Sequence, residues 1–294
     1  MYYNPYENIE NSVRIKTNFH THAGTGEGTC GRHPIEMVTE LYRGLGFNAL
    51  CISNHDLYTE TAEYSNERMF MIPGVEYSNE GHMLTIGVKE SFHNLNHQDA
   101  VNETLKHGGF TILCHPNWIR REYWPLENMI TLQGFAGIEV MNTLIYRLSG
   151  SGMAADLWDK LLKKGRLVYG FGNDDFHYPF DAGRCWNEFF AVENNYAGLK
   201  QAADSGSFTV STGPVLQRLT FEKNTINVKV RLPIETYIKD FTYKFINENG
   251  VESQVYGEEA EYALKGENYI RIEAVAENGS MLFTQPVYKK EFYA

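Results

Sequence analysis

Apolar and polar positions follow two different patterns along the chain. From Arg14 to about Val210, short apolar runs are separated by amphipathic stretches, which is typical of buried strands that alternate with helices. After Pro214 the apolar positions recur at every second residue, for example across 228–232 and 270–274. The sequence therefore predicts an α/β unit, residues 1–212, followed by a small all-β, sandwich-like unit, residues 213–294. We expect the first unit to fold alone, because each unit has its own core pattern.

Individual elements can be placed within this outline. Helices are indicated behind Pro34, where Ile35, Val38 and Tyr42 recur at helical spacing, and across 153–162. Strands are indicated at 48–53, 110–114, 137–141 and 166–172, and the pattern favours a mainly parallel sheet.

Composition narrows the functional classes. The 294 residues are 43% hydrophobic and 14% aromatic, so a sizeable core is available. The formal net charge of -11 disfavours binding along an extended nucleic acid, although a locally positive pocket remains compatible with it. Residues 1–10 lack a signal-peptide pattern and no apolar run could span a bilayer, so we expect a cytoplasmic protein without a membrane partner. Four widely spaced cysteines predict reduced thiols.

Polar and ionisable residues follow the ends of the predicted strands. His55 and Asp56 follow the first strand, His115 the second, Asn142 the third, and 174–177 the fourth. All ten histidines precede Pro179, and six of them lie at or beside predicted strands. One strand-end histidine is more often a hydrogen-bonding residue than a ligand, but several with interleaved carboxylates favour divalent ions such as Zn, Mn or Fe.

The segment Gly26-Glu27-Gly28-Thr29-Cys30-Gly31 also fits the dinucleotide-binding pattern G-x-G-x-x-G. That alternative requires the glycines directly between strand and helix, with an acidic residue closing the next strand. Here His20-Thr21-His22 intervenes and His55-Asp56 closes the next strand. We instead expect the glycines to let the chain curl and point Glu27 toward metal ions.

The order of these motifs resembles the PHP (polymerase and histidinol phosphatase) superfamily of metal-dependent phosphoesterases, over roughly residues 14–210. The matching segments are His20-x-His22, Glu27-Gly28, Asn54-His55-Asp56, Gly74-Val75-Glu76, Gly81-His82, His115-Pro116 and Asp175-Phe176-His177. The sequence differs from the family pattern in using Glu27 for the usual aspartate and Asn54 before His55, and in the short gap between Glu76 and His82.

The resemblance implies a distorted (β/α)7 barrel with a centre of two or three divalent transition-metal ions. One ion would be held by His20, His22, Glu76 and Asp175. Glu76 would bridge to a second ion at His82 and His115, and a third would take Glu27, His55 and His177.

For other polar residues the sequence indicates a functional role less specifically. Arg32 and Arg184 lie near the metal-binding loops and could grip a phosphate, or could be solvated loop arginines. Asp56, Asp174 and Glu139 could orient ligand histidines or cap helices. Cys114 precedes His115 on a strand, so the two side chains should face opposite ways and a buried core thiol is expected.

These observations predict a metal-dependent hydrolase of a small phosphate ester, such as a nucleotide or sugar phosphate. The small β unit after the "STGP" segment is also similar to the CehA/McbA branch, where carbamates or other esters are hydrolysed. A non-catalytic metal-binding module is the remaining alternative.

Overall fold

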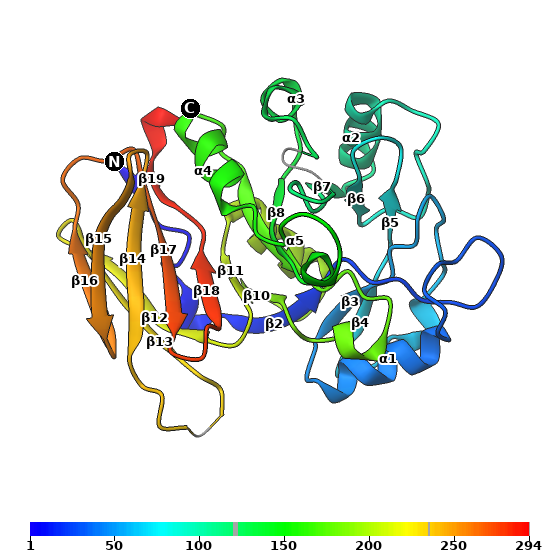
Figure 1. Ribbon diagram of the computed structural model, residues 1–294, viewed down its shortest axis with the longest axis horizontal. Coiled ribbons are helices and arrows are strands. Elements are labelled where there is room, and N and C mark those ends of the chain that lie inside the picture. Colours follow the sequence, from blue (N-terminus) through cyan, green and yellow to red (C-terminus); the bar gives the residue numbers. More distant parts are fainter. Residues whose placement is uncertain (120–122, 235, 294) are drawn as a thin grey trace.

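A mixed α/β part and a C-terminal β part make up the fold, and Figure 1 shows the β part beside the helices. This computed structural model describes residues 1–119, 123–234 and 236–293. The α/β class expected from the sequence is confirmed, while the count of seven strand-helix units stays a prediction. In the described residues the strands form three sheets.

The first sheet of the α/β part carries the opening histidine motif. It contains the parallel strands β2 (Val13–Asn18), β3 (Ala49–Cys51) and β4 (Phe70–Ile72). On the other side of β2 it continues through two antiparallel strands, β10 (Trp186–Ala191) and β11 (Phe208–Ser211). The end of β2 therefore lies beside the end of β3.

The second sheet runs in the order β5 (Gly74–Tyr77), β6 (Met83–Ile86), β7 (Phe110–Leu113), β8 (Gly137–Asn142) and β9 (Tyr169–Asn173). β7, β8 and β9 are parallel, but β6 is antiparallel to both β5 and β7. The expectation of a mainly parallel sheet is wrong here. Only five residues separate β5 from β6, which is too short for a parallel crossover.

Isolated β-bridges link the two sheets on both sides. Thr21, beyond β2, pairs with Phe176, beyond β9, and His55, beyond β3, pairs with Glu76 in β5. These bridges make the α/β part barrel-like. They also bring the polar ends of β2, β3, β5 and β9 to one place.

An aromatic cluster fills the space between the two sheets. Phe19 beyond β2 contacts Phe110 of β7 edge to face at 5.6 Å between ring centroids, and Phe189 stacks on Phe208 at 4.6 Å. Phe171 lies 4.8 Å from Phe208. Each such pair contributes about 0.5–1.5 kcal/mol beyond its buried area, so the cluster fixes the spacing of the strands that carry the site.

Helices cover the outer faces of both sheets. α1 (Ile35–Gly44) packs Val38 and Tyr42 against the first sheet, which agrees with the predicted helix behind Pro34. α4 (Ala155–Lys163), also predicted, buries Leu157 and Trp158 against the second sheet. The other α-helices in the described part of the chain are α2 (His97–Lys106), α3 (Leu126–Thr131) and α5 (Tyr196–Ser205).

The C-terminal part consists of two sheets packed around one apolar core. A three-stranded sheet contains β12 (Val215–Glu222), β13 (Thr225–Arg231) and β16 (Glu259–Ala263). It faces strands β14 (Phe241–Asn247), β15 (Gly250–Gly257), β17 (Tyr269–Ala276), β18 (Met281–Thr284) and β19 (Val287–Lys289). The core between them contains Leu216, Val228, Phe245 and Ile272, as the alternating pattern predicted.

The sheet containing β14 and β17 is continuous with the first sheet of the α/β part. β11 pairs with β18, with Val210 opposite Phe283, and β1 (Tyr2–Tyr3) pairs with β19. Figure 1 shows β18 beside β11, and both chain ends on the β side of the molecule. The boundary at 212/213 stays a prediction, but the parts on either side of it share a sheet.

Candidate metal centre

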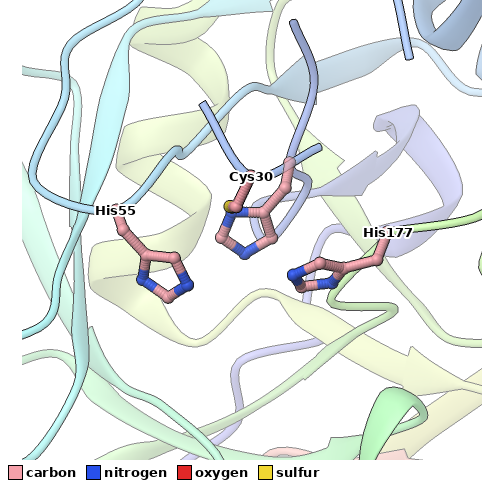
Figure 2. Close-up of side chains that lie close together, drawn as sticks. Cys30, His55 and His177 are labelled. Carbon is pink, nitrogen blue, oxygen red and sulfur yellow. The ribbon is translucent and has the colours of Figure 1, made fainter. Parts of the chain in front are cut away.

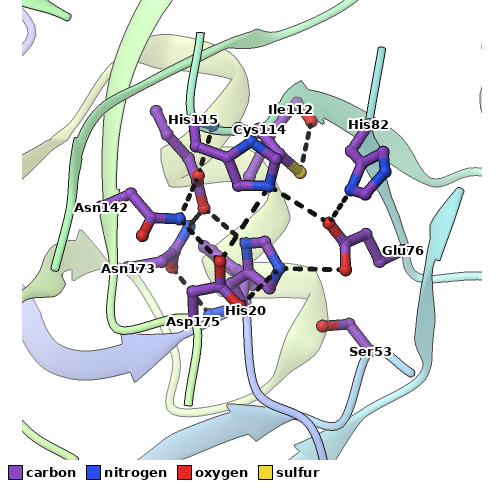
Figure 3. Close-up of polar contacts among 12 residues, drawn as sticks. His20, Ser53, Glu76, His82, Ile112, Cys114, His115, Asn142, Asn173 and Asp175 are labelled. Atoms are coloured by element: carbon purple, nitrogen blue, oxygen red, sulfur yellow. Dashed lines mark hydrogen bonds and ion pairs between the residues drawn. The ribbon is translucent and has the colours of Figure 1, made fainter. Parts of the chain in front are cut away.

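Ionisable side chains from both sheets meet where the strands end. His20 and His22 follow β2, His55 follows β3, and Asp175 and His177 follow β9. Glu76 lies within β5, His82 directly precedes β6, and His115 lies just beyond β7. Figure 3 shows that His20, Glu76, His82, His115 and Asp175 converge. The structure therefore brings together all the metal ligands expected from the sequence except Glu27.

Glu76 is the centre of this arrangement. The residue is fully buried, and its Oε2 lies 3.2 Å from Nε2 of both His20 and His22 and 2.9 Å from Nδ1 of His55. Its Oε1 lies 2.9 Å from Nδ1 of His82 and 3.4 Å from Nε2 of His115. Each carboxylate oxygen thus faces a different group of imidazoles, which is the geometry a carboxylate needs to bridge two ions.

Asp175 contributes the second buried carboxylate. Its Oδ1 lies 3.3 Å from His20 Nε2 and 3.2 Å from His22 Nε2, while its Oδ2 accepts a hydrogen bond from Asn142 at 3.2 Å. The backbone at Asp175 has φ 54°, and His115 has φ 30°. Non-glycine residues rarely adopt this region, which costs about 1–3 kcal/mol and is concentrated at functional sites.

The donor set fits divalent metal ions. Nε2 of His20, Nε2 of His22 and Oε2 of Glu76 are buried without a hydrogen-bond partner among the described residues. Unsatisfied buried polar atoms of this kind are rare and costly in folded proteins. Imidazoles and carboxylates are also the ligands that Zn, Mn and Fe accept. A bound ion would satisfy all three atoms at once.

The pKa shifts of the clustered side chains also agree with a metal site. Burial disfavours the charged form of His20, but the carboxylates of Asp175 and Glu76 outweigh it and hold its pKa well above the ordinary value. Burial likewise opposes charge on Glu76, but His20 and His55 hold its pKa well below the ordinary value. Both pKa shifts favour a protonated imidazole beside an ionised carboxylate in the metal-free site. Metal binding must displace these protons, so metal affinity should fall at acid pH.

Glu139 holds His20 in place from the side opposite Glu76. The buried Glu139 carboxylate lies 2.8 Å from His20 Nδ1 and accepts hydrogen bonds from His115 N at 2.7 Å, Asn142 Nδ2 at 2.8 Å and Asn173 Nδ2 at 2.9 Å. Through its contact with Nδ1, Glu139 leaves Nε2 of His20 free to bind an ion.

Asp174 and Asp56, the other two acids considered as possible orienters of ligands, accept hydrogen bonds from loop residues. Asp174 accepts hydrogen bonds from the backbone of residues 183–185 and from Tyr42 Oη. Burial raises the Asp174 pKa to about 7 against these hydrogen bonds. Asp56, with φ 51°, accepts bonds from the backbone and hydroxyl of Ser78. Both carboxyls fix the backbone beside ligands rather than a ligand side chain.

The structure does not bring Glu27 to the ligands. Glu27 is exposed, and Cys30 instead lies with His22, His55 and His177 in one group of ligand atoms. The chain does curl at the glycines, as expected, but the curl turns Glu27 outward. Hydrogen bonds from Thr29 Oγ1 to the carbonyls of Gly24 and Gly26 close this turn. A cysteine inside a glycine-rich loop after H-x-H is the sequence signal that would have indicated Cys30.

Neither arginine weighed as a phosphate ligand lines the cavity beside the metal ligands. Arg32 is exposed and donates a hydrogen bond to Tyr178 Oη at 2.8 Å. Arg184 is exposed and lines a separate hollow with Tyr146 and Met281. Roles for these two arginines stay predictions.

Cys114 lies on the same side as His115, against the expectation of opposite faces. Its sulfur is within 4.8 Å of ligand atoms of His20, Glu76 and His115. β7 ends at Leu113, and the positive φ of His115 breaks the strand alternation. Burial raises the Cys114 pKa well above its ordinary value, which agrees with the expected core thiol.

A cavity of about 200 Å³ opens beside the ligands. Four apolar residues, Trp118, Leu144, Ile145 and Leu148, line it together with expected ligands that include Glu76 and His115. No Lys or Arg is among the described residues that line it.

Comparison with solved structures supports the fold. A two-domain protein from Bacteroides vulgatus ATCC 8482, containing a predicted PHP-like metal-dependent phosphoesterase, aligns over 95% of this chain and 96% of its own length. The TM-score is 0.56 and the sequence identity 15%. The two proteins share a fold. No protein-family model and no curated protein matches the chain.

Two structures of endonuclease Q are more distant. The lesion-specific enzyme from Pyrococcus furiosus has a TM-score of 0.45 and 13% identity, and a complex with a 27-mer duplex substrate has a TM-score of 0.48 and 12% identity. Each alignment covers 65% of this chain and 56% of the other. At these TM-scores a shared fold is not established. The expectation that extended nucleic acid is not bound gains no support from them.

All four cysteines are free. Within the described residues, no helix combines the length and the apolar character needed to cross a membrane.

Proposed function

We propose that this protein is a metal-dependent hydrolase of phosphate esters. The observation that carries the proposal is Glu76, whose two buried oxygens face five histidines while Oε2 has no hydrogen-bond partner among the described residues. The shared fold with a protein containing a predicted PHP-like phosphoesterase supports the same class of reaction.

The site offers places for two ions around Glu76. His20, His22 and Asp175 surround the Oε2 side, and His82 and His115 surround the Oε1 side. We propose Mn, Zn or Fe, because imidazole and carboxylate ligands suit these metals. When bound, such ions supply a nucleophile from water near neutral pH and offset charge on phosphoryl oxygens.

The chain's own residues position these ions and shape the substrate site. Glu139 fixes the orientation of His20, and Asn142 donates a hydrogen bond to Asp175 while also contacting Glu139. Trp118, Leu144 and Leu148 line the same cavity as the ligands and give it an apolar surface. This wall would contact the leaving group and exclude bulk water, which strengthens charge interactions at the reacting phosphate.

Two features favour a small ester, such as a nucleotide or sugar phosphate. The cavity of about 200 Å³ is below the usual range of about 300–1,000 Å³ for ligand pockets. The net charge of -11 also repels a long phosphate backbone outside the cavity.

A substrate panel tests this function. Metal-loaded protein is assayed on mononucleotides, sugar phosphates, a long oligonucleotide and aryl carbamates or carboxyl esters, at low and moderate salt. We expect turnover of the small phosphate esters with weak salt dependence, because the charges that bind the phosphate act at short range. Cleavage of only the oligonucleotide would contradict the small substrate, and cleavage of only carbamates or carboxyl esters would contradict phosphoester hydrolysis.

Glu76→Gln tests the site. Glu27→Gln is the control, because it makes the same chemical change at an exposed glutamate. We expect Glu76→Gln to lower kcat/KM by about 100-fold or more, since even changes to residues that only hydrogen-bond a ligand cost about 10–100-fold. Glu27→Gln should be near wild type because Glu27 is exposed and outside the ligand clusters. Equal activity of Glu76→Gln and wild type would remove Glu76 from the site.

A further inference from the structure

A second group of ligand atoms lies beside the Glu76 centre. Cys30, His22, His55 and His177 each offer one atom, and these atoms lie within 4.8 Å of one another. The Cys30 sulfur is 3.1 Å from His22 Nδ1, and in Figure 2 Cys30 lies between His55 and His177. The His22 ring is 4.7 Å from that of His55 and 4.4 Å from that of His177, centroid to centroid.

The loop backbone fixes the position of this thiol. A Cβ atom on Gly31 would lie 2.3 Å from Ala23 N and 2.4 Å from the carbonyl carbon of His22. Only glycine allows this approach, so the residue before it is held against the histidine motif. On the other side, Asn54 Oδ1 accepts a hydrogen bond from Ala23 N at 3.1 Å, and Asn54 Nδ2 donates to Ala23 O at 2.8 Å. Backbone packing therefore holds Cys30 beside the histidine motif.

His22 already faces the Glu76 centre through Nε2, which lies 3.2 Å from both Glu76 Oε2 and Asp175 Oδ1. Its other nitrogen, Nδ1, faces the sulfur and can donate a hydrogen bond to it. This leaves Cys30, His55 and His177 as donors for a separate ion. Three protein ligands with an open position are typical of catalytic rather than structural zinc sites.

We propose that Cys30 is the thiolate ligand of an additional metal ion held with His55 and His177, and that this position prefers zinc or iron(II) over manganese. The inference rests on the proposed metal-dependent function, and it deepens that function by assigning a soft donor to one ion. Thiolates favour zinc and iron, whereas carboxylate and water ligands suit manganese. The thiol proton is released to solvent when the ion binds.

A Cys–His pair at this distance also occurs in enzymes that use a cysteine nucleophile. The two roles differ in a measurable way. A thiolate bound to metal gives a charge-transfer band in the near ultraviolet with cobalt(II) and is protected from alkylation. A nucleophilic thiolate gives no such band and reacts with iodoacetamide whether or not metal is present.

The experiment is a cobalt(II) titration of metal-free protein, followed by absorption in the visible and near ultraviolet. Visible d–d bands report any cobalt in the histidine-carboxylate sites, so their complete absence would refute the proposed metal centre itself. The near-ultraviolet band reports sulfur ligation alone. We expect both in the wild type, with the near-ultraviolet band lost in Cys30→Ser. The buried core thiol Cys51 gives the matched control Cys51→Ala, which should keep both bands.

Cys30→Asp separates loss of the ligand from loss of the fold. The carboxylate should retain the additional ion without the near-ultraviolet band, and in competition it should shift the preference from zinc toward manganese by about 10-fold or more. Cys30→Ser should bind the last equivalent of zinc about 10–100-fold more weakly. Visible bands without a near-ultraviolet band in the wild type, or an unchanged zinc preference in Cys30→Asp, would overturn the proposal.

Discussion

Glu76 and Glu139 are both fully buried at the site, but their surroundings differ. Glu139 accepts hydrogen bonds from the His115 backbone and from the side chains of Asn142 and Asn173. Glu76 meets imidazole nitrogens at both oxygens. A carboxylate saturated by donors holds neighbouring groups in position, whereas one facing only imidazoles is available to metal. At the scale of single residues, this contrast distinguishes Glu76, the proposed metal ligand, from Glu139, which positions neighbouring groups.

Glu139→Gln tests the supporting role. An amide would place N–H groups against the donors that now contact the carboxylate, so His20 should lose its fixed orientation. We expect zinc affinity to fall by about 10–100-fold, measured by calorimetric titration. Glu188→Gln is the matched control, because Glu188 is also mostly buried but pairs with Arg14 at 2.9 Å away from the ligand clusters. If both variants bind zinc like the wild type, Glu139 does not position His20.

At the scale of elements, the loop between β2 and α1 determines which side chain reaches the histidines. The sequence indicated the loop and the ligands at strand ends, since those follow from motif order and strand pattern. It could not show that Gly31 packs on the His22–Ala23 backbone, because such an approach depends on the folded path of the chain. For that reason Glu27 was expected at the site and Cys30 was missed. The antiparallel β6 was missed because its short apolar run has no directional signal.

Gly31→Ala tests the packing of this loop. The added methyl group would overlap the backbone of Ala23, so the loop must move and carry Cys30 away from His22. We expect a loss of about 1–3 kcal/mol of unfolding free energy and weaker binding of the last zinc equivalent. Gly26→Ala is the control, since a Cβ there meets no atom within 4 Å. Equal melting temperatures and zinc binding in the two variants would contradict the packing argument.

At the scale of the whole molecule, the C-terminal β part stabilises the strands that carry the site. Gln285 forms hydrogen bonds with both the N–H and the C=O of Gly170 in β9, at 2.9 and 2.7 Å. Arg271 pairs with Asp159 of α4 through two nitrogens, at 2.6 and 2.8 Å. The alternating pattern after residue 214 indicated a β unit, but pairing between β11 and β18 is not encoded in any local pattern.

Truncation after residue 212 tests this dependence. The sequence alone led us to expect that residues 1–212 fold independently, but these contacts reverse that expectation. β11 would lose its partner β18, and Tyr6 Oη would lose the hydrogen bond that it accepts from Gln285 N. We expect the shortened chain to be insoluble or to unfold without a cooperative transition, as followed by circular dichroism. A soluble, cooperatively folded fragment that binds zinc would show that the α/β part is independent.

The central claim is that this centre binds ions and hydrolyses phosphate esters with them. The most direct measurement is the rate of phosphate release from a small ester as zinc or manganese is added stepwise to metal-free protein. The account predicts no turnover without metal and a rise to a plateau at two or three equivalents per chain, because the ligand groups exceed the four to six donors that one ion accepts. Turnover that is complete at one equivalent, or that is independent of metal, would contradict it.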